Sequence, residues 1–557
     1  MWRRWPNPWK PPGPEWGDGM RSYPLYINGQ DRDGQGWNYT VKASALLADP
    51  MGTFNLKRAL DLGQMDPSEA PAEVVMGRSA WGERREGAEA LEAAARASRE
   101  FARMPLDVRR AMAEDYHDAI VERAEEFVEI LIWEGHPRRL AEWELRGIIE
   151  GTAPETLDWM FAQLHSEVEQ GERRIVFSRK PDGVVCLNPP QNAAGSNSAL
   201  GFAAIAAGNA LVVKAPRSTP LSVMFLYREI VAPILDRHGA PTGTLNIISG
   251  ETKQILRQWT TSPLVDDVMF FGDSTVGLKL GADCEAAGKK AVLELSGNDA
   301  IVVWEDADLQ TAATAMCECF YGSSQICMVP KHAIVHPDVA DELIERVLER
   351  VREIRPGYPE DPDVLLSPVL KADRYFSTLA EAREAGAKVL CGGRRVDTTG
   401  APSEQGFFLE PSVVRVDGLA ESRMLACVRE ETFFPLLPVI VPTEDERTGL
   451  LDRVIDFMNA NEYGLRNSVW ASDPAVIDRF VTEVTNAGLL KVNQSHISFA
   501  APLATHGGTG RTGGPHGEMH YPILRTSHLQ GAAVVPSGTY SSEQLAAEVG
   551  LPERVAI

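Results

Sequence analysis

The sequence lacks a long apolar segment. Its longest apolar run, residues 199–213, contains two glycines and Asn209 and is too short to cross a bilayer. Arg3 and Arg4 form a twin arginine, but proline and tryptophan follow the pair in place of an apolar stretch, so no export signal is expected. We therefore expect no membrane partner.

Cysteine is scarce, and basic charge falls short of acidic charge. The seven cysteines are odd in number and lie apart, with no Cys-x-x-Cys pair and no histidine cluster of metal-ligand spacing. This pattern predicts no metal site and favours a reducing, cytoplasmic location. The 55 Lys and Arg residues against 78 Asp and Glu residues give a formal net charge of −23, which excludes nonspecific nucleic-acid binding because that needs a basic face.

Length and periodicity predict an α/β protein with about three domains. The chain has 557 residues, 44% of them hydrophobic, enough for more than one core. Apolar residues recur every three or four positions across much of residues 88–164, which predicts helices. Predicted strands and helices then alternate, which is typical of a parallel sheet covered on both faces. The strands of this first series are expected at 210–216, 244–250 and 265–272, and a second series follows Glu294 as far as about residue 492.

Two segments carry residues suited to acyl chemistry. Residues 322–328 read Gly-Ser-Ser-Gln-Ile-Cys-Met, with Cys327 two positions after the glutamine, and Glu294 stands between two leucines at the end of a predicted strand. A thiolate can form a tetrahedral adduct with an aldehyde and then a thioester. A carboxylate between apolar neighbours is costly to bury and therefore indicates a functional role, such as a general base for water. A structural cysteine and a solvated glutamate are the alternative interpretations.

Together with five further segments in the order typical of the family, these motifs resemble the aldehyde dehydrogenase superfamily over about residues 22–530. The resemblance implies that Cys327 is the nucleophile and Glu294 the base that activates water. Residues 188–197, Asn-Pro-Pro-Gln-Asn-Ala-Ala-Gly-Ser-Asn, are similar to the segment that supplies the oxyanion donor. Asn192 is the preferred donor and Asn188 the rival.

The cofactor implied by the resemblance is NADP or NAD. Lys214 matches the lysine that reaches the adenosine ribose, and Arg217 replaces a glutamate typical of NAD-preferring members. Because a guanidinium can bind a 2′-phosphate, Arg217 favours NADP, unless its side chain simply faces solvent. Glu431 and Phe433 match residues that hold the nicotinamide ribose and pack on the cofactor.

Residues 270–277, Phe-Phe-Gly-Asp-Ser-Thr-Val-Gly, are similar to the turn that approaches the pyrophosphate. Gly272 and Gly277 are expected to allow close backbone approach. Asp273 stands where the family usually has serine, and it would compete with phosphate for the helix N–H groups.

The resemblance also implies a domain plan. A Rossmann-type cofactor domain is expected at 22–164 and 182–293, an α/β catalytic domain at 294–505, and a β oligomerisation arm at 165–181 and 506–540. The arm implies a homodimer or homotetramer. Residues 1–21 are expected to form an irregular extension and residues 541–557 a tail. The segment 506–534 looks most like bacterial semialdehyde dehydrogenases of aromatic degradation, and Phe499 and His496 are candidates for the substrate entrance.

The sequence therefore predicts oxidation of an aldehyde to an acid with NAD(P)+ through a thioester on Cys327. Two alternatives stay open. One is a coenzyme A-dependent or reductive member, against which Glu294 argues; the other is a non-catalytic homologue, suggested by the substitutions at Gln191, Asp273 and Phe434.

Overall fold

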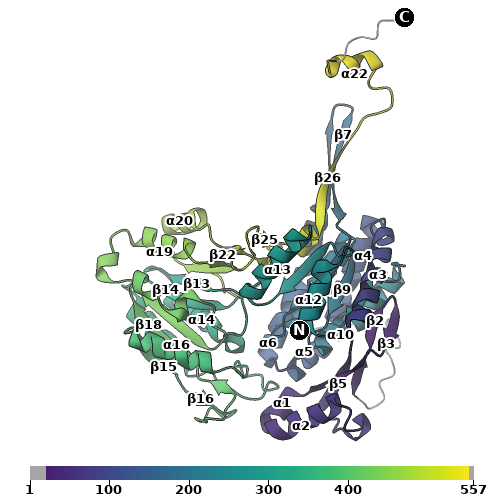
Figure 1. The fold of residues 1–557 in the computed structure, drawn as a ribbon. Helices are drawn as coiled ribbons and strands as arrows, with labels where there is room; N and C mark the ends of the chain where they lie inside the picture. Colours follow the sequence, from purple (N-terminus) through teal and green to yellow (C-terminus); the bar gives the residue numbers. More distant parts are fainter. Residues whose placement is uncertain (1–19, 551–557) are drawn as a thin grey trace, which may run out of the picture.

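The computed structural model describes residues 20–550, so the predicted extension of residues 1–21 lies almost entirely outside the described residues. The described chain forms two lobes, each built on a seven-stranded sheet, and an arm that projects from one lobe (Figure 1). The α/β class predicted from the sequence is confirmed.

The first sheet belongs to the lobe that carries the N-terminal half of the chain (Figure 1). From β12 to β10 every neighbouring pair is parallel, and β2 and β3 continue the sheet antiparallel. Strands β8 to β11 are buried along their whole length, as expected of a parallel sheet covered on both faces. The order is β12 (Lys290–Glu294), β11 (Asp267–Phe271), β8 (Val184–Asn188), β9 (Ala210–Lys214), β10 (Leu245–Ile248), β2 (Leu25–Ile27) and β3 (Gln30–Arg32).

Helices cover this sheet. The predicted helical region contains α3 (Arg84–Phe101), α4 (Leu106–Glu122), α5 (Ala124–Trp133), α6 (Arg138–Gly151) and α7 (Pro154–Ala162). Helix α3 packs on β9 and β10, and α13 (Ser274–Ala286) packs on β12. Within residues 20–550 no helix is both long and apolar enough to span a membrane.

The second sheet forms the core of the other lobe. Strand β15 is antiparallel to its neighbour, and the remaining pairs are parallel. Its central strands β13 and β14 are fully buried. The order is β15 (Lys388–Cys391), β18 (Ser412–Asp417), β19 (Leu436–Val441), β14 (Pro330–Val335), β13 (Asp299–Val303), β21 (Arg466–Trp470) and β22 (Leu489–Val492).

The arm is a three-stranded antiparallel sheet in the order β26 (Ser527–Val534), β7 (Arg173–Pro181) and β6 (His165–Gln170). Of the segment 506–540 predicted for the arm, only 527–534 join this sheet. Residues 506–526 lie on the body of the molecule instead. Their backbone forms hydrogen bonds with the segment that connects the two lobes; for example, Thr512 O accepts from Leu295 N at 3.0 Å. The predicted tail contains a helix, α22 (Ser542–Glu548).

Candidate active site

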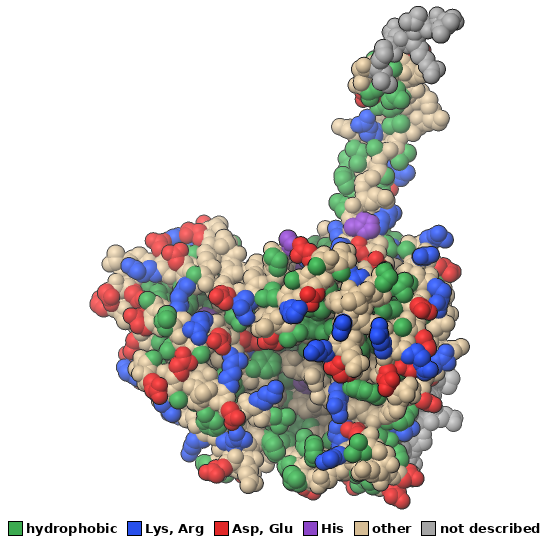
Figure 2. Space-filling model, in the orientation of Figure 1, with side chains coloured by type: hydrophobic (Ala, Val, Ile, Leu, Met, Phe, Trp, Pro, Cys, Tyr) green, Lys and Arg blue, Asp and Glu red, His purple; other side chains and the backbone are tan. Residues whose placement is uncertain are grey.

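One cavity brings together most of the residues that the sequence singled out. It has a volume of about 460 Å³ and lies at the carboxyl ends of the first sheet's strands, where α/β proteins bind their ligands. A recess between the two lobes is visible on one face of the molecule (Figure 2). The predicted residues on the cavity wall are Asn192, Lys214, Gly272, Asp273, Glu294, Cys327, Glu431 and Phe433. Arg217 and Gly277 are not on this wall.

Cys327 lies on a loop with an unusual backbone. Gly322, Ser323 and Ser324 have φ values of 56°, 57° and 61°, a left-handed conformation that serine adopts rarely. Surrounding contacts must therefore hold the loop. Ser323 Oγ donates to Ser367 O at 2.6 Å, so the strained turn is attached to the rest of the lobe.

The Lys331 ammonium group holds the same loop from beneath. Lys331 is fully buried, and its Nζ donates to Ser324 O at 2.7 Å, to Ile326 O at 2.9 Å and to Thr432 O at 3.0 Å. Burial lowers the pKa of Lys331, although Glu431 nearby raises it. Three carbonyls around one ammonium group satisfy its donors without a carboxylate contact, and two of them belong to the residues just before Cys327.

The Cys327 thiol is protonated at neutral pH. Burial, reinforced by the negative charges of Glu431 and Asp299, raises its pKa to about 12. The thiol must therefore lose its proton during the reaction.

Glu294 is held as a carboxylate. It is buried at the end of β12, its Oε2 accepts from Gly507 N at 2.9 Å, and its Oε1 lies 2.6 Å from His520 Nε2. Burial alone would raise the pKa of Glu294, but His520, His506 and the Gly507 N–H outweigh it, so the pKa lies below its usual value. An ionised carboxylate in the same cavity as the thiol can act as a base.

The two lobes meet at Gly297. A Cβ atom placed on this residue would lie 2.2 Å from the carbonyl oxygen of Cys327, so only glycine fits. Gly297 N also donates to Glu431 Oε1 at 3.1 Å. The segment that leaves Glu294 therefore touches both the nucleophile's backbone and a residue predicted to bind the cofactor.

Both candidate oxyanion donors line the cavity. Asn192 Nδ2 donates to Gln325 O at 2.9 Å, which ties Asn192 to the Cys327 loop and leaves its second N–H free of that bond. Asn188 is buried, and its Oδ1 has no hydrogen-bond partner among the described residues. The link to the Cys327 loop favours Asn192.

The cavity wall that would bind the cofactor suits the end of a dinucleotide better than its central pyrophosphate. Lys214 is buried at the end of β9, and burial lowers its pKa to about 8. Glu431 and Phe433 lie near the thiol end of the cavity. Asp273 accepts from Thr275 N at 2.8 Å and from Val276 N at 3.2 Å, so a carboxylate already uses N–H groups that a pyrophosphate would need.

Arg217 and Gly277 lie away from the cavity wall, and only Gly277 differs from the expectation. The Arg217 side chain is exposed and lies 5.7 Å over the Trp81 ring, at the outer edge of the site. A Cβ atom on Gly277 would lie 2.1 Å from a Leu295 side-chain carbon. Gly277 therefore allows α13 to pack closely on the sheet and does not line the cavity.

Sequence reasoning missed His520, Gly507 and Lys331. His520 and Gly507 lie in the segment 506–534 that the sequence had singled out, whereas Lys331 lies just after the segment 322–328, and the contacts of all three depend on chain folding. The alternating Gly and His residues of 506–520 are the only sequence signal for the first two. Of the two entrance candidates, Phe499 lines a pocket beside the thiol, whereas His496 is fully buried and its prediction was wrong.

Comparison with known proteins identifies the family. The model of the aldehyde dehydrogenase family matches residues 63–528. The chain is 29% identical over 447 residues to 3,6-anhydro-alpha-L-galactose dehydrogenase of Vibrio sp. (strain EJY3), covering 78% of this chain and 88% of that protein. It is 28% identical over 448 residues to the NADP(+) succinate-semialdehyde dehydrogenase of Escherichia coli (strain K12), covering 78% and 87%.

Solved structures share the fold. Aldehyde dehydrogenase 21 from Physcomitrella patens, in complex with the reaction product succinate, superposes with a TM-score of 0.76 at 20% identity, covering 94% of this chain and 100% of the other. Glyceraldehyde-3-phosphate dehydrogenase from Methanocaldococcus jannaschii, complexed with NADP, has a TM-score of 0.71 at 24% identity and covers 83% and 97%. With the family model matching most of the chain, this protein belongs to the aldehyde dehydrogenase family.

Proposed function

We propose that the protein oxidises an aldehyde to a carboxylic acid with NADP+, through a thioester on Cys327. The observation that carries the proposal is that Cys327, Glu294 and Asn192, which are distant in the sequence, line one cavity together with Lys214 and Glu431.

The chemistry follows from the positions of the side chains. The Cys327 thiol loses its proton, Glu294 being the ionised acceptor in the cavity, and the sulfur adds to the aldehyde carbon. The oxyanion that forms receives a hydrogen bond from the Asn192 amide. A nicotinamide bound in this cavity would supply the hydride acceptor, and loss of hydride from the adduct carbon leaves a thioester on Cys327. Glu294 releases the thiol's proton to solvent and then takes a proton from water, whose attack on the thioester releases the acid and a thiolate, which is reprotonated to the thiol.

NADP+ is the proposed cofactor because Arg217 is a cation where a carboxylate would repel a 2′-phosphate. The NADP(+) succinate-semialdehyde dehydrogenase of Escherichia coli and the methanogen structure with NADP are relatives that support this choice. Lys214 would bind the adenosine ribose, and Glu431 and Phe433 would hold the nicotinamide end.

We further propose a cytoplasmic homo-oligomer that assembles through the arm. Its outer strands β6 and β26 each have one unpaired edge within the described chain. Val168, Phe177 and Leu529 are 51%, 40% and 58% exposed, and Figure 2 shows hydrophobic side chains along the arm. The likeness of residues 506–534 to semialdehyde dehydrogenases of aromatic degradation remains a prediction.

Two variants test the reaction. We expect Cys327→Ala to lose all aldehyde-dependent NADPH formation while it still binds NADP+ in calorimetry. We expect Glu294→Gln to form about one NADPH per site in a burst and then to turn over at least about 100-fold more slowly, because a general base contributes about 10²–10⁴-fold. Full activity of Cys327→Ala would disprove the nucleophile. Acyl-coenzyme A as the product when coenzyme A is added would support the coenzyme A-dependent alternative instead.

A further inference from the structure

A second cavity adjoins the one that holds the Cys327 thiol. It has a volume of about 110 Å³, and its lining shares Asn197, Met328, Thr505 and His506 with the first cavity. Through these shared residues the apolar pocket borders the space around the reacting sulfur. If the proposed function holds, it is the place for the body of the aldehyde.

The wall of the apolar pocket is aromatic. Trp143 comes from α6, Phe161 from α7, Phe202 from α9 (Gly201–Ala207), and Phe499 from the loop after β22. The Trp143 and Phe499 rings stack with centroids 5.3 Å apart. Phe499 also packs directly on Gly147, where an added Cβ would lie 2.4 Å from the ring. The pocket is therefore shaped for an apolar or aromatic group.

No lysine or arginine lines this pocket among residues 20–550. Its one acidic residue, Glu144, is 2% exposed. Glu144 Oε2 accepts from Ser196 Oγ at 2.7 Å, whereas Oε1 has no hydrogen-bond partner among the described residues and lies 3.4 Å from His136 Nε2. Burial raises the pKa of Glu144 above its usual value. A carboxyl group there offers a ligand anion no counter-charge.

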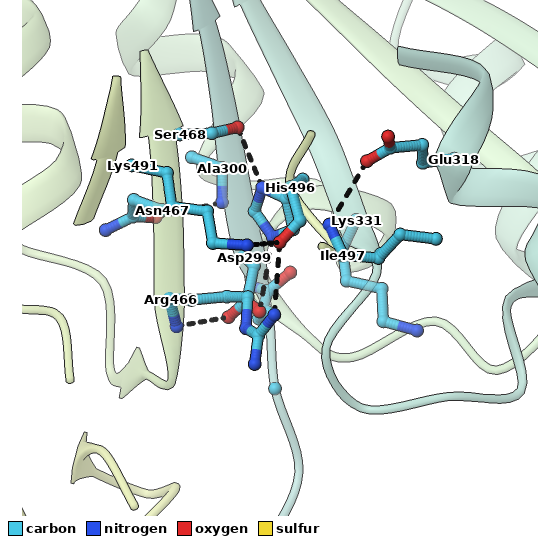
Figure 3. A network of polar contacts seen from close by, with 12 residues as sticks. Asp299, Ala300, Glu318, Lys331, Arg466, Asn467, Ser468, Lys491, His496 and Ile497 are labelled. Carbon is cyan, nitrogen blue, oxygen red and sulfur yellow. Dashed lines mark hydrogen bonds and ion pairs between the residues drawn. The ribbon is translucent and has the colours of Figure 1, made fainter. Parts of the chain in front are cut away.

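The cationic side chains behind the pocket wall already donate hydrogen bonds to the protein's own backbone. Arg466 donates to His496 O at 3.0 Å and to Thr505 O at 2.8 Å, and Lys491 donates to His496 O at 3.2 Å. These buried groups form the polar network of Figure 3, which holds the loop that carries Phe499. On the opposite side, Arg109 donates to Ala206 O at 2.7 Å. Each of these cations donates to backbone carbonyls, and none of them lines the pocket.

We propose that the enzyme selects uncharged aldehydes with an aromatic or aliphatic body and rejects aldehydes with a carboxylate tail. An unpaired carboxylate in this pocket would lose its hydration without gaining a counter-ion. An apolar body instead gains roughly 25 cal/mol for each Å² removed from water. A semialdehyde with a free carboxylate is therefore rejected; succinate is the product named in one structural relative.

A substrate panel with the full-length enzyme and NADP+ tests the proposal. We expect kcat/KM for hexanal and cinnamaldehyde to exceed that for succinate semialdehyde by at least about 100-fold, because burial of an unpaired charge costs several kcal/mol. Equal or better use of succinate semialdehyde would overturn the substrate class while leaving the proposed reaction intact. If no aldehyde in the panel is oxidised, the proposed function itself fails.

A pocket-filling variant tests the location independently. Gly151 lines the pocket at the end of α6, and a Cβ on it would meet no atom within 4 Å, so Gly151→Leu can fill the space without a clash at its first carbon. We expect this variant to lower kcat/KM for hexanal at least about tenfold and to leave acetaldehyde unchanged. The matched control is Gly36→Leu, which is equally open but lies on β4 (Gly36–Val41). An equal loss for both aldehydes, or no loss for either, would refute the assignment of the pocket.

Discussion

Replacing His520 should move the acidic limb of the enzyme's pH profile. His520 Nε2 lies 2.6 Å from Glu294 Oε1, and both side chains are buried. In His520→Leu the buried Glu294 carboxylate loses its main compensation, and the Gly507 N–H at 2.9 Å and His506 remain. The pKa of Glu294, now held below its usual value, should therefore rise.

The size of the rise follows from the geometry. Two unit charges about 4 Å apart interact by about 4 kcal/mol at an effective dielectric constant of about 20, which corresponds to about 3 pKa units. With one hydrogen bond retained, we expect a rise of about 1–2 units. Since Glu294 works as a base only when ionised, activity should be lost at a correspondingly higher pH as the solution is acidified.

The assay is NADPH formation between pH 5 and 9, with the burst phase recorded at each pH. His520→Leu should shift the acidic limb of kcat upward and slow the steady state more than the burst. His520→Gln, which retains an N–H donor, should restore part of the shift. His528→Leu removes a 57%-exposed histidine side chain on the arm and is the control. An unchanged limb in a folded His520→Leu enzyme would refute the link between His520 and the base.

Three other predictions follow from the same site. Asp273→Ser should free the N–H groups of the α13 N-terminus and lower KM for NADP+ about tenfold, measured by steady-state kinetics, whereas an unchanged or higher KM would mean that the pyrophosphate binds elsewhere. Arg217→Ala should raise KM for NADP+ about tenfold and leave KM for NAD+ nearly unchanged, and equal effects on both cofactors would remove the 2′-phosphate role. Because the pKa of Cys327 is raised to about 12, its alkylation by iodoacetamide in the free enzyme should accelerate steadily from pH 7 to pH 10. Mass spectrometry follows the alkylation, and a plateau near pH 8 would show that the pKa of the thiol is far lower.

The fold and the main site residues could be predicted because their signals are local or ordered. Buried strands such as 210–214 are continuous apolar runs, and the motif around Cys327 stands in a fixed order with that around Glu294. Parallel strands then bring their carboxyl ends to one edge, whatever the intervening sequence. This is why Asn192, Lys214 and Glu294 meet at one cavity.

The remaining features depend on contacts between segments that are distant in the sequence, and no local sequence pattern indicates such contacts. His520 reaches Glu294 only because residues 506–526 fold back on the body rather than joining the arm. In the sequence Lys331 is an ordinary strand residue. Only in the folded chain does the loop before Cys327 lie over its ammonium group and accept its hydrogen bond. Gly277 fits the phosphate-turn pattern, but the close contact with Leu295 gives it a packing role.

The contact between Gly297 and the Cys327 carbonyl makes the joint between lobes part of the reaction centre. The base sits at the end of one lobe's sheet and the sulfur before a strand of the other, so a small rotation of the lobes changes the spacing that hydrolysis needs. Partial opening of this joint costs less free energy than global unfolding. On mild heating, catalysis should therefore disappear while both sheets still give a native circular dichroism spectrum.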